Sequence, residues 1–429
     1  MTKYFFKTAF ITSIVFNALL ITDATNAYPI DGYEETGIKR LEYYRLSDTG
    51  EIKGKTLQQG AKKGVDEIKP RLIGKVTSTE LPEADTSIGK KLKPLIPSQA
   101  WRYSIALLDL TDPDAPIYAE HNGDYKSNVG SVGKILVAVA LFAKLQELYP
   151  DDVEIRRQLL RNTIVTADEF VNSDHHKVRF WDIEKKTVKR RPLKVGDQGN
   201  LYEYLDWAIS PSSNAAAAML QRELVLLSYF GKAYPVADDV AKAYLSETSK
   251  TELGDLFLDA MVSPLQRAGI DTDKLRQGSF FTRTGKNRVL GTNSYGNPQQ
   301  LIKLLYLMEA GKLVDEFSST ELKRLLYSTE RRIRYASHPN LNDHSVYFKS
   351  GSLYSCQDEE GFTCGKYKGN KKNLLASVAI VESEEDGKKY HYLVVVQSNV
   401  LKINSAVAHQ TLAARIHKLV KSLHQESAE

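Results

Sequence analysis

The chain has 429 residues, of which 42% are hydrophobic and 26% charged, enough to bury the core of one large domain or two ordinary ones. Its formal net charge of +5 is spread over this whole length, and the sequence has no basic stripe with interleaved aromatic residues, which argues against a nucleic-acid partner. The mild positive balance favours, at most, anionic partners such as cell-wall polymers.

Residues 1–27 have the pattern of a cleaved export signal. Lys3 and Lys7 form a short basic start, an almost uninterrupted apolar run follows over 9–21, and Thr25-Asn26-Ala27 offers the small residues that a signal peptidase reads. A membrane anchor is the alternative, but the run is shorter than the roughly 20 residues that a spanning helix needs. We therefore expect a mature protein that begins at Tyr28, keeps no stable membrane anchor and is periplasmic or secreted.

The rest of the chain divides into a polar segment and a patterned one. Residues 28–98 are rich in Lys, Glu and Gly and weakly patterned, and we interpret them as an extension outside the catalytic core. The domain itself covers 99–429. It opens with a strand-like segment at 103–110 that is apolar on both faces, followed by a hairpin partner at 117–119. The segment from Ser131 to Leu148 is apolar nearly all round and predicts a buried helix.

The remaining segments predict an α+β fold. Residues 178–193 alternate apolar with basic side chains and predict a solvated hairpin, and 200–330 are mainly helical in pattern, with breaks that include Pro264. Three strands and an amphipathic helix complete the chain, at 346–350, 374–381, 390–399 and 406–423. We predict an antiparallel sheet flanked by helices, a mainly helical subdomain, and an active-site cleft between them.

Three short motifs occur in order within these elements. Ser131-Val132-Gly133-Lys134 opens the buried helix, Ser212-Ser213-Asn214 follows a proline in the helical region, and Lys349-Ser350-Gly351 ends a strand. The set resembles that of the penicillin-recognising serine enzymes, most closely class A β-lactamases and D-alanyl-D-alanine peptidase-like hydrolases, over roughly residues 101–424. Ser87–Lys90 and Arg283–Gly285 imitate the first and third motifs, but they lack the long apolar helix and the following strands.

The spacing of the first motif suits nucleophilic catalysis. Residues three apart share a helix face, so Lys134 lies beside Ser131. A serine hydroxyl needs a base to take its proton, and a buried lysine near a second cation has a lowered pKa and can be that base. Lys349 is the candidate second cation. We therefore predict that Ser131 is the nucleophile and Lys134 its base.

The resemblance implies roles for the other motif residues. Ser212 relays a proton to the leaving nitrogen, and Asn214 holds Lys134 and the substrate amide. Backbone N–H groups of Ser131 and Ser352 form the oxyanion hole. Lys349 and Ser350, in one motif with Gly351, bind the carboxylate shared by β-lactams and peptidoglycan stem peptides ending in D-alanine.

Each motif residue also has a structural interpretation. Ser131 and Ser212 could cap helices, and Lys349 could be an edge-strand charge. Adjacent His175 and His176 rarely point at one ion, so we expect no metal and no other cofactor. A Ser–His–Asp triad has no supporting Gly-x-Ser-x-Gly motif.

Cys356 and Cys364 are the only cysteines, and their spacing suits a disulfide-closed loop after the third motif, with two free thiols as the alternative.

The sequence departs from class A β-lactamases at the deacylating acid. The family places it in a Glu-x-x-Leu-Asn loop, which 215–348 lack, and the corresponding stretch 283–294 contains no acid. We therefore expect a Ser131 acyl-enzyme on a β-lactam or D-alanyl-D-alanine-type amide that is weak as a β-lactamase. One alternative is a true class A-like β-lactamase with a relocated base such as Glu247 or Glu252. Another is an inert periplasmic binding protein.

Overall fold

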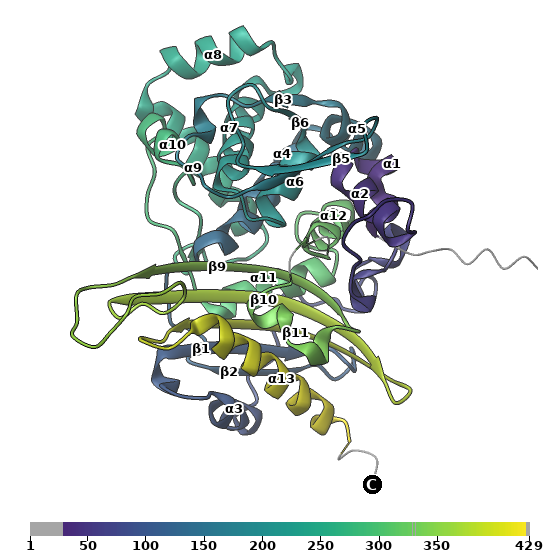
Figure 1. Ribbon diagram of the computed structural model, residues 1–429, viewed down its shortest axis with the longest axis vertical. Helices are drawn as coiled ribbons and strands as arrows, with labels where there is room; N and C mark the ends of the chain where they lie inside the picture. The colour runs from purple at the N-terminus through teal and green to yellow at the C-terminus, as the bar shows by residue number, and fades with distance from the viewer. Residues whose placement is uncertain (1–28, 328, 331, 426–429) are drawn as a thin grey trace, which may run out of the picture.

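A five-stranded antiparallel sheet forms the lower half of the protein in the computed structural model (Figure 1). The structure describes residues 29–425 except 328 and 331, so the expected signal peptide lies outside the described residues. The strand order is β2-β1-β11-β10-β9. The strands are β1 (Tyr103–Asp109), β2 (Ile117–His121), β9 (Ser345–Ser355), β10 (Lys372–Glu385) and β11 (Lys388–Asn399).

Side chains alternate between two cores along these strands because successive residues point to opposite faces of a sheet. Ile105 pairs with Val396 and faces the core under α3 (Thr86–Leu92) and α13 (Ser405–Leu423). Ala106 pairs with Val395 and faces the larger core shared with the helical half. Both faces are covered, as the apolar β1 sequence predicted.

The helical half surrounds α4 (Gly133–Leu148), which is buried along most of its length (Figure 1). Its other helices are α5 (Val153–Asn162), α6 (Leu201–Ile209), α7 (Asn214–Phe230), α8 (Asp238–Glu247), α9 (Lys250–Arg267), α10 (Arg283–Arg288), α11 (Pro298–Glu309) and α12 (Glu316–Tyr327). Short strand pairs join them: β3 (Ile164–Thr166) with β6 (Gln198–Asn200), β4 (Val178–Asp182) with β5 (Thr187–Arg191), and β7 (Leu275–Arg276) with β8 (Tyr295–Gly296).

The predicted α+β architecture is confirmed, with one element boundary to correct. Pro264 does not break the helical pattern but lies buried in the last turn of α9. There its missing N–H costs a single helical hydrogen bond, and three more residues continue the helix. Within the described part of the chain, no helix is long and apolar enough to cross a membrane.

Residues of the 28–98 segment contribute to both cores. α1 (Tyr33–Thr36) and α2 (Lys39–Asp48) lie against the helical half, and Leu41 and Tyr44 belong to its core (Figure 1). Arg40 forms a buried ion pair with Asp206 of α6. Ile88 of α3 packs on the sheet. The sequence suggested an extension outside the core because the segment is rich in charged residues, and many of these charges are in fact paired with distant residues.

Candidate active site

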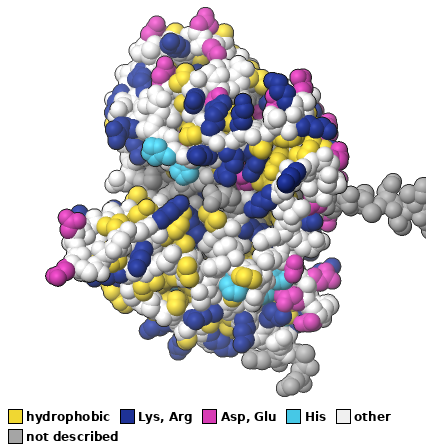
Figure 2. Space-filling view, in the orientation of Figure 1, with side chains coloured by type: hydrophobic (Ala, Val, Ile, Leu, Met, Phe, Trp, Pro, Cys, Tyr) yellow, Lys and Arg dark blue, Asp and Glu magenta, His cyan; other side chains and the backbone are white. Residues whose placement is uncertain are grey.

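A cleft of about 480 Å³ separates the sheet from the helical half and contains residues of all three motifs. β9 forms its lower wall, and the start of α4 and the turn before α7 form its upper wall. Lys and Arg side chains gather near this boundary on the face shown in Figure 2. The fold therefore brings together three sequence segments that lie far apart in the chain.

Ser131 lies in a single 3-10 turn, Gly130–Val132, that leads directly into α4. The residue at the cap position of α4 is Val132, and no side chain caps the helix there. Ser131 instead accepts a hydrogen bond from Nζ of Lys134 at 3.1 Å. The helix-capping interpretation of Ser131 is thus excluded by the geometry.

Lys134 is almost fully buried and is held by oxygen atoms from the second motif. Its Nζ donates to Oδ1 of Asn214 at 2.8 Å and to the carbonyl of Ser212 at 2.6 Å. Burial lowers the pKa of Lys134 to about 7, although the Asp174 carboxylate acts in the opposite direction. A large fraction of Lys134 is therefore neutral near neutral pH, as a general base for Ser131 must be.

Ser212 lies between the two motif lysines. Its hydroxyl accepts from Nζ of Lys349 at 2.8 Å and lies 3.4 Å from Nζ of Lys134. Its φ of 67° is a left-handed conformation that non-glycine residues rarely adopt, which is typical of functional positions. Ser212 does not cap α7. Ser213 does, by accepting from the N–H of Ala216.

Lys349 is on the edge strand β9 but points into the cleft, with only 3% of the residue exposed. Burial, reinforced by the positive charges of Lys134 and Arg334, lowers the pKa of Lys349 well below its ordinary value. Among the described residues, no carboxylate forms an ion pair with either Lys134 or Lys349. An incoming carboxylate would supply the missing partner.

Two glycines allow β9 to approach the serine turn closely. A Cβ on Gly351 would lie 2.4 Å from the backbone nitrogen of Ser131 and 2.1 Å from the carbonyl oxygen of Val129. Gly130 has a φ of 54°, and a Cβ there would meet the nitrogen of Ser352 at 3.2 Å. The backbone nitrogens of Ser131 and Ser352 are thereby brought to the same end of the cleft, as an oxyanion hole requires.

Arg334 is a cleft residue that the motif search missed. Its guanidinium donates to Oγ of Ser350 at 2.6 Å, to Oγ of Ser352 at 3.1 Å and to the hydroxyl of Tyr367 at 3.0 Å. Its φ of 54° is left-handed. A guanidinium beside Lys349 and Ser350 suits recognition of a carboxylate. No sequence signal marked it, because it begins a single 3-10 turn, Arg334–Ser337, that is too short to have a periodic pattern.

Asp174 and His176 form a second group that the sequence did not indicate. Asp174 accepts from Oγ of Ser213 at 2.8 Å and from the N–H of Ala215 at 2.9 Å, and it contacts Nδ1 of His176 at 2.6 Å. Burial raises the pKa of Asp174, but these hydrogen bonds outweigh it and hold the pKa well below its usual range. The carboxylate thus fixes the turn that carries Ser212 and Asn214, while His176 lines the cleft.

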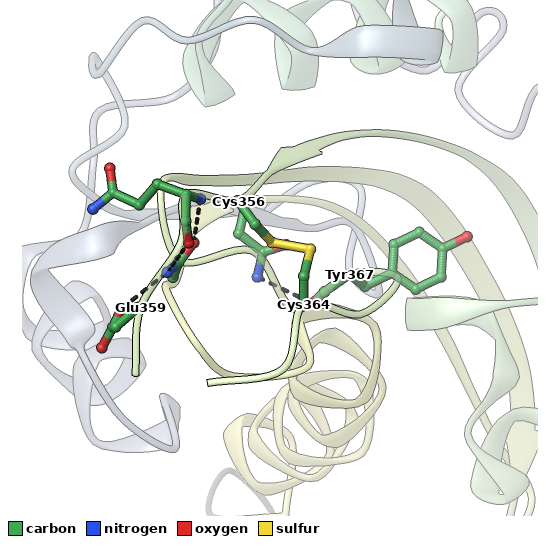
Figure 3. The surroundings of a disulfide bond; sticks show 7 residues. Cys356, Glu359, Cys364 and Tyr367 are labelled. Atoms are coloured by element: carbon green, nitrogen blue, oxygen red, sulfur yellow. Dashed lines mark hydrogen bonds between the residues drawn. A yellow bond between two sulfur atoms is a disulfide. The ribbon is translucent and has the colours of Figure 1, made fainter. Parts of the chain in front are cut away.

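A disulfide joins Cys356 and Cys364 in the structure (Figure 3). The loop that they close is further held by Asn370, whose side chain accepts from the N–H of Gln357 and donates to Glu359 (Figure 3). Tyr367 follows this loop and contacts Arg334. The side chain of Tyr367 thus connects the loop to the wall of the cleft that carries Arg334 and Ser350.

An amide and an aromatic ring pack against the first turn of α4, beside the motif lysine. A Cβ on Gly133 would lie 2.1 Å from Oε1 of Gln277 and 3.6 Å from Cζ of Phe281. The Phe281 ring centroid is 4.9 Å from Nζ of Lys134. Glu247 and Glu252 are exposed on α8 and α9, and neither lines the cleft. Gln277 and Phe281 precede the stretch 283–294, in which the sequence analysis expected the counterpart of the Glu-x-x-Leu-Asn loop.

Comparison with known proteins assigns the chain to a family. Residues 87–421 match the model of the beta-lactamase enzyme family, and the chain belongs to that family, within the penicillin-recognising serine enzymes. In sequence, the chain matches no curated protein.

Solved structures of β-lactamases share the fold at low identity. TLA-3 extended-spectrum β-lactamase is 12% identical over 79% of this chain and 98% of its own, with a TM-score of 0.52. A variant of TLA-1 extended-spectrum β-lactamase is 13% identical over 79% and 98%, with a TM-score of 0.50. A β-lactamase from Chitinophaga pinensis is 15% identical over 79% and 98%, with a TM-score of 0.48. At these identities the likeness concerns the fold.

Proposed function

We propose that this protein is an exported serine hydrolase that forms an acyl-enzyme on Ser131 with β-lactams or with D-alanyl-D-alanine-type amides. The observation that carries the proposal is the Ser131 hydroxyl 3.1 Å from the buried amine of Lys134, whose pKa is about 7. Export rests on the pattern of residues 1–27 and on the disulfide, which suits an oxidising compartment.

The acylation step follows from the contacts in the cleft. Neutral Lys134 takes the proton of Ser131 while Oγ attacks the amide carbonyl, and the N–H groups of Ser131 and Ser352 stabilise the oxyanion. The proton then passes through Ser212 to the leaving nitrogen as the C–N bond breaks. Lys349 and Arg334 hold the substrate carboxylate, with help from the hydroxyls of Ser350 and Ser352.

Deacylation of a β-lactam should be slow because Gln277 and Phe281 cover the first turn of α4. An amide cannot take a proton from water at neutral pH, and a phenyl ring excludes water. Lys134 can activate water only where the leaving group has departed. A peptide releases its amine, whereas an opened β-lactam keeps its ring nitrogen in that space.

Stopped-flow acylation followed by a mass-spectrometric time course tests this proposal. We expect rapid addition of one penicillin to Ser131, then an adduct that persists far longer than a β-lactamase turnover. Gln277→Glu should release the adduct at least about tenfold faster by supplying a general base. Gln277→Met is the matched control and should stay slow.

The outcomes separate the alternatives. Release at many turnovers per second by the wild type would indicate an efficient β-lactamase and a carboxylate that reaches the cleft. No adduct with either penicillin or a D-alanyl-D-alanine peptide would indicate a binding protein.

A further inference from the structure

Two histidines and a glutamate converge away from the cleft, where the sheet meets the last helix. His344 directly precedes β9, Glu385 ends β10 at its hairpin turn, and His417 is on α13. Oε1 of Glu385 lies 2.6 Å from Nε2 of His417 and 3.3 Å from Nε2 of His344. The candidate ligand atoms of the three residues all lie within 4.8 Å of one another, and both histidines are buried.

We propose that His344, Glu385 and His417 bind a divalent transition-metal ion, and that zinc fits this donor set best. Two imidazole nitrogens and one carboxylate oxygen are three of the ligands that tetrahedral zinc takes in proteins, and water can complete the coordination. Magnesium and calcium prefer sites made of oxygen alone, so the two imidazoles select against them.

The surroundings hold these side chains in a suitable orientation. Nδ1 of His417 lies 3.2 Å from the hydroxyl of Tyr392, so the second ring nitrogen is hydrogen-bonded, as is usual for histidines that bind metal. Nζ of Lys421 contacts Oε2 of Glu385 at 2.6 Å and leaves Oε1 directed at the histidines.

Charged side chains of both signs surround the site. Arg332 lies close enough to affect His344, and its guanidinium is occupied by backbone carbonyls, including that of His344 itself. Asp343 and Asp386 add negative charge next to His344 and Glu385, and Lys421 adds one positive charge. A divalent cation therefore enters a region with three carboxylates and two cationic side chains, where it is not repelled by a net positive charge.

A neighbouring cluster shows what a site filled by the protein itself looks like. Glu309, Glu382 and His391 also have the spacing of metal ligands. There, however, Nζ of Lys323 lies 2.7 Å from Glu309 and 2.7 Å from Glu382, so an ammonium group already serves as the cation. In the His344 cluster the only described lysine in contact, Lys421, binds the outer oxygen of Glu385.

The proposed site is separate from the active site and does not depend on the proposed function. Lys349 follows His344 by five residues along β9, which corresponds to roughly 16 Å of extended strand. Bound zinc would fasten the β10–β11 hairpin to α13 and to the start of β9. No sequence motif indicates this site, because the three ligands come from segments far apart in the chain.

Zinc titration of the tag-free mature protein, stripped with EDTA, tests the site by calorimetry. We expect one zinc ion per chain and, with Co²⁺ as a probe, the intense visible bands of tetrahedral coordination. His417→Gln and Glu385→Gln should each weaken zinc binding at least about 100-fold, since each removes one of three protein ligands. His391→Gln, in the lysine-filled cluster, is the matched control and should bind zinc like the wild type.

Thermal unfolding gives a second readout. Saturating zinc should raise Tm in the wild type and in His391→Gln, but not in the two site variants, because only a folded site binds the ion. Near-UV circular dichroism checks that each variant is folded. Should His417→Gln fail to fold, Glu385→Gln decides, because Glu385 lies beside the hairpin turn and is partly exposed. Absence of saturable binding by the wild type, or equal binding by the site variants, would overturn the proposal.

Discussion

Buried lysines occur at two places on the helix-covered face of the sheet, in opposite electrostatic settings. In the cleft, Lys134 and Lys349 share the hydroxyl of Ser212 and have no carboxylate partner among the described residues. Elsewhere on the same face, Lys323 of α12 is fully buried between Glu309 and Glu382. Lys63 and Arg71 of the 28–98 segment bind the same Glu382.

The difference shows where the fold satisfies buried charge and where it does not. At Lys323 the charges are compensated, and the network fastens the amino-terminal segment to the sheet. In the cleft, Lys134 and Lys349 have no carboxylate partner among the described residues. Burial therefore lowers the pKa of these lysines and does not stabilise the fold through an ion pair. Buried ionisable groups without a partner are therefore the better indicator of chemistry in this molecule.

The largest expected effect tests whether the cleft is catalytic at all. Ser131→Ala should abolish formation of the penicillin adduct and reduce turnover by on the order of 10⁶-fold, because it removes a nucleophile that acts as a unit with Lys134. Intact-mass spectrometry after incubation with penicillin measures this. Labelling of the variant at the wild-type rate would show that Ser131 is not the nucleophile.

Matched lysine-to-methionine variants compare the two settings directly. Lys323→Met leaves the buried carboxylate of Glu309 without its lysine partner, while Glu382 keeps Lys63 and Arg71, and should lower the free energy of unfolding by about 3–5 kcal/mol. Lys134→Met leaves no uncompensated charge and should cost at most about 1 kcal/mol, while slowing acylation by about 10²–10⁴-fold. Denaturant unfolding and stopped-flow acylation provide the two measurements. Equal losses of stability would contradict the contrast.

The pH dependence of acylation sharpens the comparison further. Only neutral Lys134 can accept the Ser131 proton, and its pKa is about 7. The second-order rate constant for acylation should therefore fall about tenfold for each pH unit below that value and level off above it. Stopped-flow measurements at a series of pH values from about 5 to about 9 check this. A flat profile down to pH 5 would exclude Lys134 as the base.

The smallest expected effect concerns the disulfide at the rim of the cleft. Replacing Cys356 and Cys364 together by serine should lower stability by about 2–3 kcal/mol at most, because the closed loop is short. Acylation should slow less than tenfold, since the hydrogen bond between Arg334 and Tyr367 links the loop to the site from outside the Cys356–Cys364 ring. Thermal unfolding and the rate of adduct formation, each measured for the wild type and for the double variant, test this. Complete loss of labelling would show that the disulfide loop is required for acylation.

The sequence by itself determined the alternating strands, the buried helix after Ser131 and the order of the three motifs. These follow from local periodicity and from residue spacing along a helix, which need no knowledge of distant contacts. The cysteine pair was also evident, because its two members lie close in the chain.

Only the tertiary structure decided which residues from other parts of the chain pack around the three motifs. Asp174, Gln277 and Phe281 lie in irregular segments, and Arg334 begins a short 3-10 turn. None of them belongs to a periodic pattern, and long-range packing places them against the motif residues. The same holds for the 28–98 segment, whose charges look solvated in sequence but pair across the fold, as Arg71 does with Glu382. Burial and charge pairing depend on neighbours in space, so they become visible only once the chain is folded.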